Sequence, residues 1–179
     1  MLRDFSVTPK AKNKNAITLM SAFFLLSLIS LVVTVFLEKY KGVVSLVTFA
    51  SLITAILVYT KYVSVLFHYD IIAENVDEPL FVVRQTIGRR NDTLCRISLL
   101  NVTSIQKETA KERRAHKTPV GVAKYVYTPT LFPDENYRIT VFSRKQKAEI
   151  LVEISDEFAK MLTEMVSEAK LLMPSEDDE

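Results

Sequence analysis

The chain is 179 residues long and nearly neutral, with 23 Lys or Arg, 21 Asp or Glu and a formal net charge of +2. This balance argues against a nucleic-acid-binding protein, and the single cysteine rules out an internal disulfide framework. Its three glycines, Gly42, Gly88 and Gly121, lie too far apart for a phosphate-cradling loop or a dinucleotide fingerprint, so no nucleotide cofactor is expected.

The first segment, residues 1–15, is a basic N-terminal arm. It is followed by 22 uncharged residues, 16–37, which as a helix reach about 33 Å and so span a hydrocarbon core. A cleaved signal peptide has a shorter apolar stretch, so this alternative does not fit the segment. The basic residues of the arm are Arg3, Lys10, Lys12 and Lys14.

A second apolar segment begins within five residues of the first. Residues 42–60 are 19 uncharged residues that reach roughly 28 Å as a helix, and the apolar character continues past Lys61, which can snorkel. A buried helix of a soluble domain would need a polar face, which this segment lacks. We therefore predict a transmembrane helical hairpin over residues 16–66, with helices at about 16–37 and 42–66.

Small polar side chains recur at helical spacing in both helices. We predict that they pack the helices together, because small residues let helices approach closely in lipid. A polar lining for a permeation path is disfavoured, because neither span holds a charged or amide side chain. The positions are Ser45, Thr48, Ser51 and Thr54 on the second helix and Ser27, Ser30 and Thr34 on the first.

The distribution of Lys and Arg around the helix ends predicts the orientation of the hairpin. Four of these residues precede the first helix and two lie in the loop 38–41, which favours a cytoplasmic N-terminus. Two spans return the chain to the same side, so we expect a multi-pass protein of the cell membrane with both termini cytoplasmic. The lone Cys95 fits a reducing compartment.

From residue 67 onward, apolar and polar residues alternate, which is typical of half-buried strands. Arg138 and Thr140 alternate with Tyr137, Ile139 and Val141 in one of the clearest cases. A polar connection is expected over residues 108–120. About seven strands are predicted, at residues 67–73, 80–87, 93–99, 102–107, 122–128, 137–143 and 148–154.

One amphipathic helix ends the domain. Ser155 can cap it, acidic residues occupy its first turn, and Pro174 lies just beyond its end. Its single apolar stripe has to lie on a sheet face or an open barrel end. Residues 67–173 are thus expected to form a cytoplasmic domain, and residues 174–179 an acidic tail.

This order of elements resembles the bacterial membrane proteins that carry a pleckstrin-homology-like domain behind a transmembrane pair. The passages RISLLNVTSIQKE, Arg96 to Glu108, and ISDEFAKML, Ile154 to Leu162, also look like that family. The resemblance implies an α+β fold, in which the hairpin precedes an antiparallel β-barrel or sandwich of about seven strands with a C-terminal helix. The basic headgroup site of the eukaryotic namesakes is not transferred, because the matching region, residues 74–79, is acidic.

The sequence assembles no catalytic or metal site. His68 and His116 lie far apart without further ligands at metal-site spacing, so no metal is expected. Cys95 and His116 could in principle pair as nucleophile and base, but the strand phase points Cys95 inward as a structural thiol. An enzyme is not expected.

One basic cluster is a candidate binding site, made by Lys107, Lys111, Arg113, Arg114 and Lys117 together with His116. Under a cytoplasmic leaflet, each Lys or Arg could add about 1 kcal/mol of attraction to anionic lipid headgroups. The alternatives are a protein partner or a solvated loop whose charges pair locally, for instance Glu108 with Lys111.

The aromatic stretch from Tyr125 to Pro133 is a second candidate, as an edge segment, a partner groove or a cover for the core. The function expected is that of a non-enzymatic, membrane-anchored interaction or scaffold module that binds a protein partner or copies of itself. The alternative is a small accessory subunit of a membrane transporter or other membrane complex, with the hairpin as the functional part.

Overall fold

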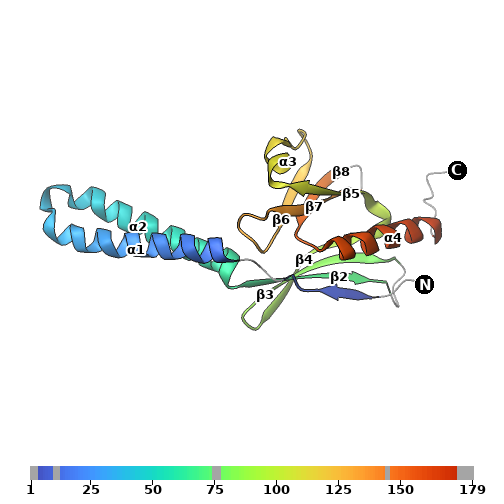
Figure 1. Ribbon diagram of the computed structural model, residues 1–179, viewed down its shortest axis with the longest axis horizontal. Coiled ribbons are helices and arrows are strands. Elements are labelled where there is room, and N and C mark those ends of the chain that lie inside the picture. The colour runs from blue at the N-terminus through green and yellow to red at the C-terminus, as the bar shows by residue number, and fades with distance from the viewer. Residues whose placement is uncertain (1–3, 10–12, 74–77, 144–145, 173–179) are drawn as a thin grey trace. The chain divides into compact units, whose positions relative to one another are not determined.

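The computed structural model describes residues 4–9, 13–73, 78–143 and 146–172. Two compact units divide the chain between them. One is a helical unit, residues 12–65, and the other combines residues 1–11 with residues 66–179. Figure 1 shows both units with their helices and strands labelled, and each is described by itself.

The helical unit is an antiparallel hairpin. Helix α1 spans Lys14–Phe36, a short 3₁₀ turn follows at Glu38–Tyr40, and helix α2 spans Lys41–Val58. A π-helical turn, Tyr59–Val63, extends α2. The two long helices, Lys14–Phe36 and Lys41–Val63, have mean hydropathies of 2.5 and 2.2 over their most apolar windows and are long enough to cross a membrane.

Small side chains line the contact between α1 and α2. Ser27 and Ser30 of α1 and Thr48 and Ser51 of α2 are all buried. The hydroxyl of Thr48 donates to the carbonyl of Val44 at 2.9 Å, which satisfies it within its own helix. The described side chains on the outside of the hairpin are largely exposed and aliphatic or aromatic, which suits contact with lipid tails.

The remaining predicted packing positions of α2 lie at the margin of this contact. Ser45 and Thr54 are half-buried, and the hydroxyl of Thr54 donates to the carbonyl of Ala50 at 2.8 Å. At the open end of the hairpin, the side-chain amide of Asn13 donates to the carbonyl of Tyr62 at 2.7 Å. This bond joins the first and last turns of the helical unit.

The second unit holds two sheets of four strands each among the described residues. The first sheet has the order β1-β2-β3-β4, and its strands span Phe5–Val7, Val65–Ile72, Leu80–Ile87 and Arg90–Ser98. Strand β1 precedes the hairpin in the chain and β2 follows it, yet the two pair antiparallel, with Phe5 opposite Ile71. The hairpin is therefore an insertion between two neighbouring strands of one sheet.

Side chains reinforce the pairing of β1 with β2. The hydroxyl of Thr8 lies 2.7 Å from Nδ1 of His68, and Oδ1 of Asp4 accepts from the amide of Ala73 at 2.6 Å. The segment expected as a basic arm, residues 1–15, thus contributes a strand and the start of α1. Its three-residue strand is too short to show an alternating pattern.

The second sheet has the order β5-β7-β8-β6. Its strands are Val102–Thr109, Ala123–Tyr127, Glu135–Ser143 and Gln146–Val152 for β5 to β8. The expectation of an antiparallel β-barrel or sandwich is corrected here in its strand pairing, and its barrel alternative does not hold. Strands β6 and β8 pair parallel, because the connection from β6 to β7 passes over the position that β8 then fills between them, and the two sheets do not close into a barrel.

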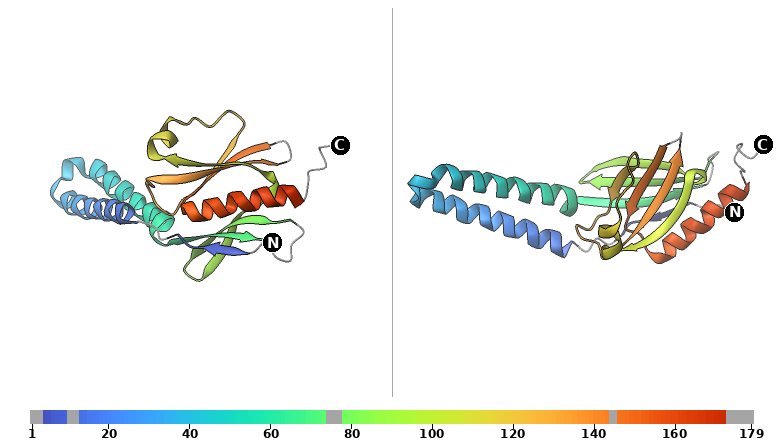
Figure 2. Two further views of the ribbon diagram at one scale, coloured as in Figure 1. Left: turned by 45° about the vertical axis from the view of Figure 1, so that its right-hand side comes forward. Right: turned by 90° about the horizontal axis from the view of Figure 1, so that it is seen from above.

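Helix α4, Asp156–Leu172, runs between the two sheets, as Figure 1 and the left view of Figure 2 show. Its apolar stripe packs into the core, where Phe158 and Leu162 are 2% and 0% exposed. Tyr69 and Phe81 supply the first sheet's share of this core, and Ile139 supplies part of the second sheet's share. Four residues of the predicted stripe, Phe158, Leu162, Met165 and Ala169, are buried, whereas Met161 is half-buried and Leu172 at the end of the helix is exposed.

A short helix that the sequence analysis did not predict, α3 at Ala110–Ala115, follows β5. It lies on the face of the second sheet that points away from α4 (Figure 1). Helix α3 therefore covers part of the face of the second sheet that α4 leaves free.

Candidate interaction surface

Two reciprocal hydrogen bonds between Thr109 and Glu112 cap the N-terminus of helix α3. The hydroxyl of Thr109 accepts from the amide of Glu112 at 3.4 Å, and Oε2 of Glu112 accepts from the amide of Thr109 at 2.8 Å. This is a capping box. Because Glu112 is held as a carboxylate by these donors, its pKa lies below its ordinary value. A helix of six residues has little stability of its own, so the cap and the contacts below it decide that it forms.

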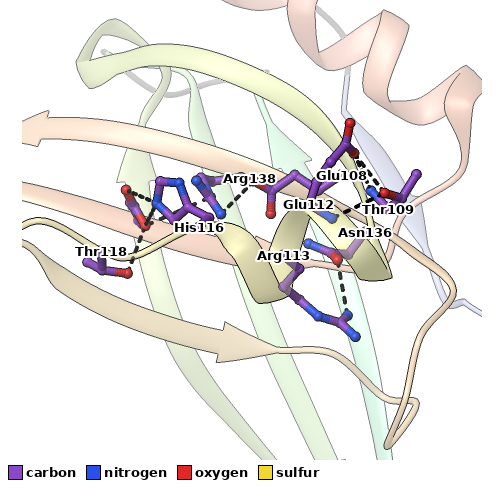
Figure 3. Close-up of polar contacts among 9 residues, drawn as sticks. Glu108, Thr109, Glu112, Arg113, His116, Thr118, Asn136 and Arg138 are labelled. Atoms are coloured by element: carbon purple, nitrogen blue, oxygen red, sulfur yellow. Dashed lines mark hydrogen bonds and ion pairs between the residues drawn. The ribbon is translucent and has the colours of Figure 1, made fainter.

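Three side chains hold α3 and the following residues on the sheet, as Figure 3 shows. Arg113 donates to the side-chain oxygen of Asn136 at 3.1 Å. Nε2 of His116 lies 3.1 Å from Oε1 of Glu149, and the hydroxyl of Thr118 donates to Oε2 of the same carboxylate at 3.2 Å. The segment is thus fixed to the sheet by the second half of α3 and by the residues that follow it.

A buried ionic network lies beneath α3. Nη2 of Arg138 lies 2.5 Å from Oε1 of Glu108, and Nε of Arg138 lies 3.8 Å from Oε2 of Glu149. The side chains of all three are between 5% and 9% exposed. One guanidinium therefore stands between two carboxylates, and His116 adds a second nitrogen partner for Glu149.

The alternating pattern predicted that the polar residues of these strands lie on the solvent-facing side of half-buried strands. In the structure Arg138, Thr140 and Glu149 are all buried. Alternation identified the strands, but it could not show that α3 would cover their polar face. The sequence did contain complementary charges that could have indicated a buried ionic network, at Glu108, His116, Arg138 and Glu149. Their proximity depends on strand register, which the sequence alone does not give.

The structure divides the predicted basic cluster. Lys107 points to the other side of the sheet, where its Nζ lies 2.8 Å from Glu135 and 2.9 Å from Asp156. Arg113 is half-buried against Asn136. Three members remain exposed together on α3 and just after it, namely Lys111, Arg114 and Lys117.

Lys107 belongs to a network that joins β5 to the start of α4. Oδ1 of Asp156 accepts from the hydroxyl of Tyr137 at 2.6 Å as well as from Lys107. The hydrogen bond from Tyr137, and then that from Lys107, lower the pKa of Asp156. Partial burial, and then the bond to Asp156, raise the pKa of Tyr137 to about 12. Lys107 therefore has a local structural role.

A groove of about 400 Å³ lies between β4 and the face of the second sheet that also packs against α4. Cys95 and Ile97 line it from β4, Tyr125 and Tyr127 from β6, and Ile150 from β8. The tyrosine rings stack with centroids 6.2 Å apart. Burial raises the pKa of the Cys95 thiol, which keeps it protonated at neutral pH and makes it a poor nucleophile.

The aromatic stretch has two roles along its length. Tyr125 is exposed at the groove, whereas Thr128, Pro129 and Thr130 are buried. Thr130 bonds Glu153 through both its amide and its hydroxyl, at 3.2 and 2.8 Å. The first part of the stretch thus lines an open groove, and the second part covers the fold.

The two histidines do not meet. His68 lies between Thr8 and Thr86, 3.1 Å from the latter, while His116 contacts Glu149. Over the parts of the chain that the structure describes, no group of three or more His, Cys, Asp or Glu side chains could hold a metal ion. Cys95 and His116 form no hydrogen bond with each other.

The chain matches no protein-family model, no curated protein and no solved structure. The resemblance to pleckstrin-homology-like domains accordingly stays an expectation drawn from element order. The α+β architecture, with two apolar helices, two sheets and a C-terminal helix, is what the structure provides.

Proposed function

We propose that this protein is a membrane-anchored, non-enzymatic interaction module, with its hairpin in the bilayer and a pleckstrin-homology-like domain displayed at the inner membrane surface. The apolar length of both helices supports the anchoring. Tethering a binding domain to a membrane raises its local concentration for partners at the same surface.

The observation that carries the interaction role is the groove between β4 and β6. Among the described strands, each of these has a neighbour on one side only, so both are sheet edges. Tyr125 and Val126 of β6 are 47% and 55% exposed. An edge with exposed aromatic and aliphatic side chains is a template for an added strand, and such addition is a common mode of peptide recognition.

The pairing of β1 with β2 supports the orientation part of the proposal. Since the two strands flank the hairpin and share one sheet, both ends of the hairpin have to lie on one side of the bilayer. The excess of Lys and Arg before α1 then favours the cytoplasmic side.

Photo-crosslinking from the groove tests the interaction role. A benzoyl-phenylalanine at Tyr125 of the full chain, expressed in its own membrane, is expected to form a defined adduct with a partner or a second copy. The same probe at the exposed Thr103 of β5 is the matched control. Ala148→Trp, which fills the groove, should abolish the Tyr125 adduct. Identical adducts at both positions, or none at Tyr125, would count against the proposal.

A second candidate function is favoured by a groove on the hairpin itself. Met20, Phe24, Leu52 and Ile56 contribute to an almost wholly apolar groove of about 620 Å³ between α1 and α2. Such a groove could accept a helix of a membrane complex in which this chain is a small accessory subunit.

Ser21, which also lines the hairpin groove, provides the discriminating variant. Ser21→Leu should disrupt complex formation in the accessory-subunit role and leave the Tyr125 crosslink intact in the interaction-module role. Leu at Thr48 or Ser51 is unsuitable, because both side chains are buried between the two helices and the hairpin itself would be disturbed.

A further inference from the structure

We propose that the connection from β5 to β6 together with the first two residues of β6, Ala110–Lys124, is a membrane-contacting segment that inserts Val120 into an anionic lipid surface while its Lys and Arg side chains bind headgroup phosphates. We call this segment the basic loop. The inference rests on the proposed insertion of the hairpin, because the hairpin brings a lipid surface within reach.

The tip of the basic loop is an aliphatic side chain held fully in solvent. Val120 is 106% exposed, the highest value among the large apolar side chains of the described residues. A tight turn holds it there, because the amide of Val122 donates to the carbonyl of Pro119 at 3.2 Å and Gly121 has a φ of +86°. The turn thus keeps a Val side chain away from the core, and membrane insertion would bury it.

Charge around the tip favours an anionic surface. The basic loop contains five Lys or Arg and one Glu, a formal net charge of +4 with His116 neutral. The carboxylate of the single acid, Glu112, bonds Thr109 in the capping box, and its negative charge is already included in this net charge. The cations that remain exposed are Lys111, Arg114, Lys117 and Lys124.

The neighbouring strand adds to the same face. Lys124 lies opposite Glu149 in the pairing of β6 with β8, and side chains two residues apart on a strand share a face. Lys147, two residues before Glu149 and also exposed, therefore lies on the same side of the sheet as Lys124. Val126 and Phe142, 55% and 56% exposed, share that side and add apolar surface.

The loop is preorganised for contact with a surface. Arg113 is fixed to Asn136, and His116 and Thr118 are fixed to the buried Glu149, so the second half of α3 and the residues after it are anchored before any lipid is met. A loop that is already ordered loses less conformational entropy on binding. An exposed apolar tip with cations around it fits the layered polarity of a bilayer surface, where charged headgroups lie above acyl chains.

The test uses the full chain in lipid nanodiscs. Val120→Cys is made in a Cys95→Ser background and labelled with an environment-sensitive fluorophore, and the discs contain phosphatidylcholine alone or with phosphatidylglycerol. We expect quenching of the label by brominated lipid in the anionic discs only. High salt should reverse it, since the screening length falls from about 10 Å at 0.1 M to about 3 Å at 1 M.

Two comparisons make the result specific. Leu171→Cys is the matched control, because Leu171 is an aliphatic residue that is 83% exposed and is followed by the acidic tail. It should show no quenching in either disc. The combined variant Lys111→Gln, Arg114→Gln and Lys117→Gln should remove the quenching at position 120, while circular dichroism checks that it stays folded.

Equal quenching at position 120 in neutral and anionic discs, or none in anionic discs, would overturn the proposal. So would a spectral shift at position 120 that needs added cytoplasmic extract, because that result assigns the basic loop to a protein partner. Failure of the unlabelled chain to enter nanodiscs at all is a separate outcome. It would refute both membrane anchoring and this inference, whereas loss of the Tyr125 crosslink alone would leave the lipid contact standing.

Discussion

The guanidinium of Arg138 and the carboxylate of Glu108 form a contact of 2.5 Å between neighbouring strands of the second sheet, with both side chains at least nine-tenths buried. Glu149 approaches the same guanidinium from β8. A buried charge of this kind is tolerated because its partners are present, and the network is correspondingly sensitive to loss of any one partner.

Arg138→Met is expected to destabilise the domain by about 3–5 kcal/mol, because it leaves Glu108 and Glu149 buried without their shared cation. Unfolding by urea, followed in detergent by near-ultraviolet circular dichroism, measures the change. Arg114→Met, at an exposed position of α3, should stay within about 0.5 kcal/mol of the parent. Equal effects of the two substitutions would contradict the structural role of the buried network.

Thr109→Ala should loosen α3. It removes one half of the capping box, which is typically worth about 1 kcal/mol, from a helix too short to persist without it. Hydrogen exchange at the amides of Glu112 and Arg113 should accelerate, and trypsin should cleave after Arg113 or Arg114 more readily. Thr103→Ala, an exposed change on the same strand β5, should leave both readouts unaltered.

The pairing of β1 with β2 can be trapped by a disulfide. Thr8 and His68 contact each other at 2.7 Å, so Thr8→Cys with His68→Cys, in a Cys95→Ser background, should oxidise rapidly to an intramolecular bond detectable by mass spectrometry of the digested protein. Thr8→Cys with Thr93→Cys on β4 should not. Failure of the first pair to cross-link would show that the N-terminal segment is not part of the sheet.

Acid should weaken the attachment of α4. The pKa of Asp156 in the folded protein lies below its ordinary value of 3.8, so its contribution to stability is complete above that value and is lost as the pH falls through the lower folded pKa. Asp156→Asn should therefore lose less stability between neutral pH and strongly acidic pH than the parent does. Thermal unfolding across that range measures the difference, and parallel curves would argue against the network of Lys107, Tyr137 and Asp156.

Most elements follow from their own residues. The predicted strand at 80–87 coincides with β3, and the predicted helix at 16–37 agrees with α1 to within two residues. The predicted helix at 42–66 begins one residue after α2 begins but runs past Val58 and the π turn into the first residues of β2. Long apolar runs and clear alternation specify their structure locally, and the apolar stripe of α4 does the same.

Elements that depend on distant partners were missed. Strand β1 has three residues and gains its structure from β2, which lies beyond the hairpin in the chain. Helix α3 is made of polar residues, and its place on the sheet depends on Glu149, which comes much later in the sequence. The groove at Cys95 and the parallel pairing of β6 with β8 likewise depend on how the sheets are assembled.

The insertion of the hairpin between β1 and β2 also sets an order of events during synthesis. Strand β1 leaves the ribosome first and has no partner until both apolar helices have been made and residues Val65–Ile72 have emerged. In the proposed topology, the first sheet can be completed only after the helices have entered the bilayer as a pair. A chain with one helix left behind would keep its first strand and its second on opposite sides of the membrane, and the folding of the domain would thereby report on correct insertion.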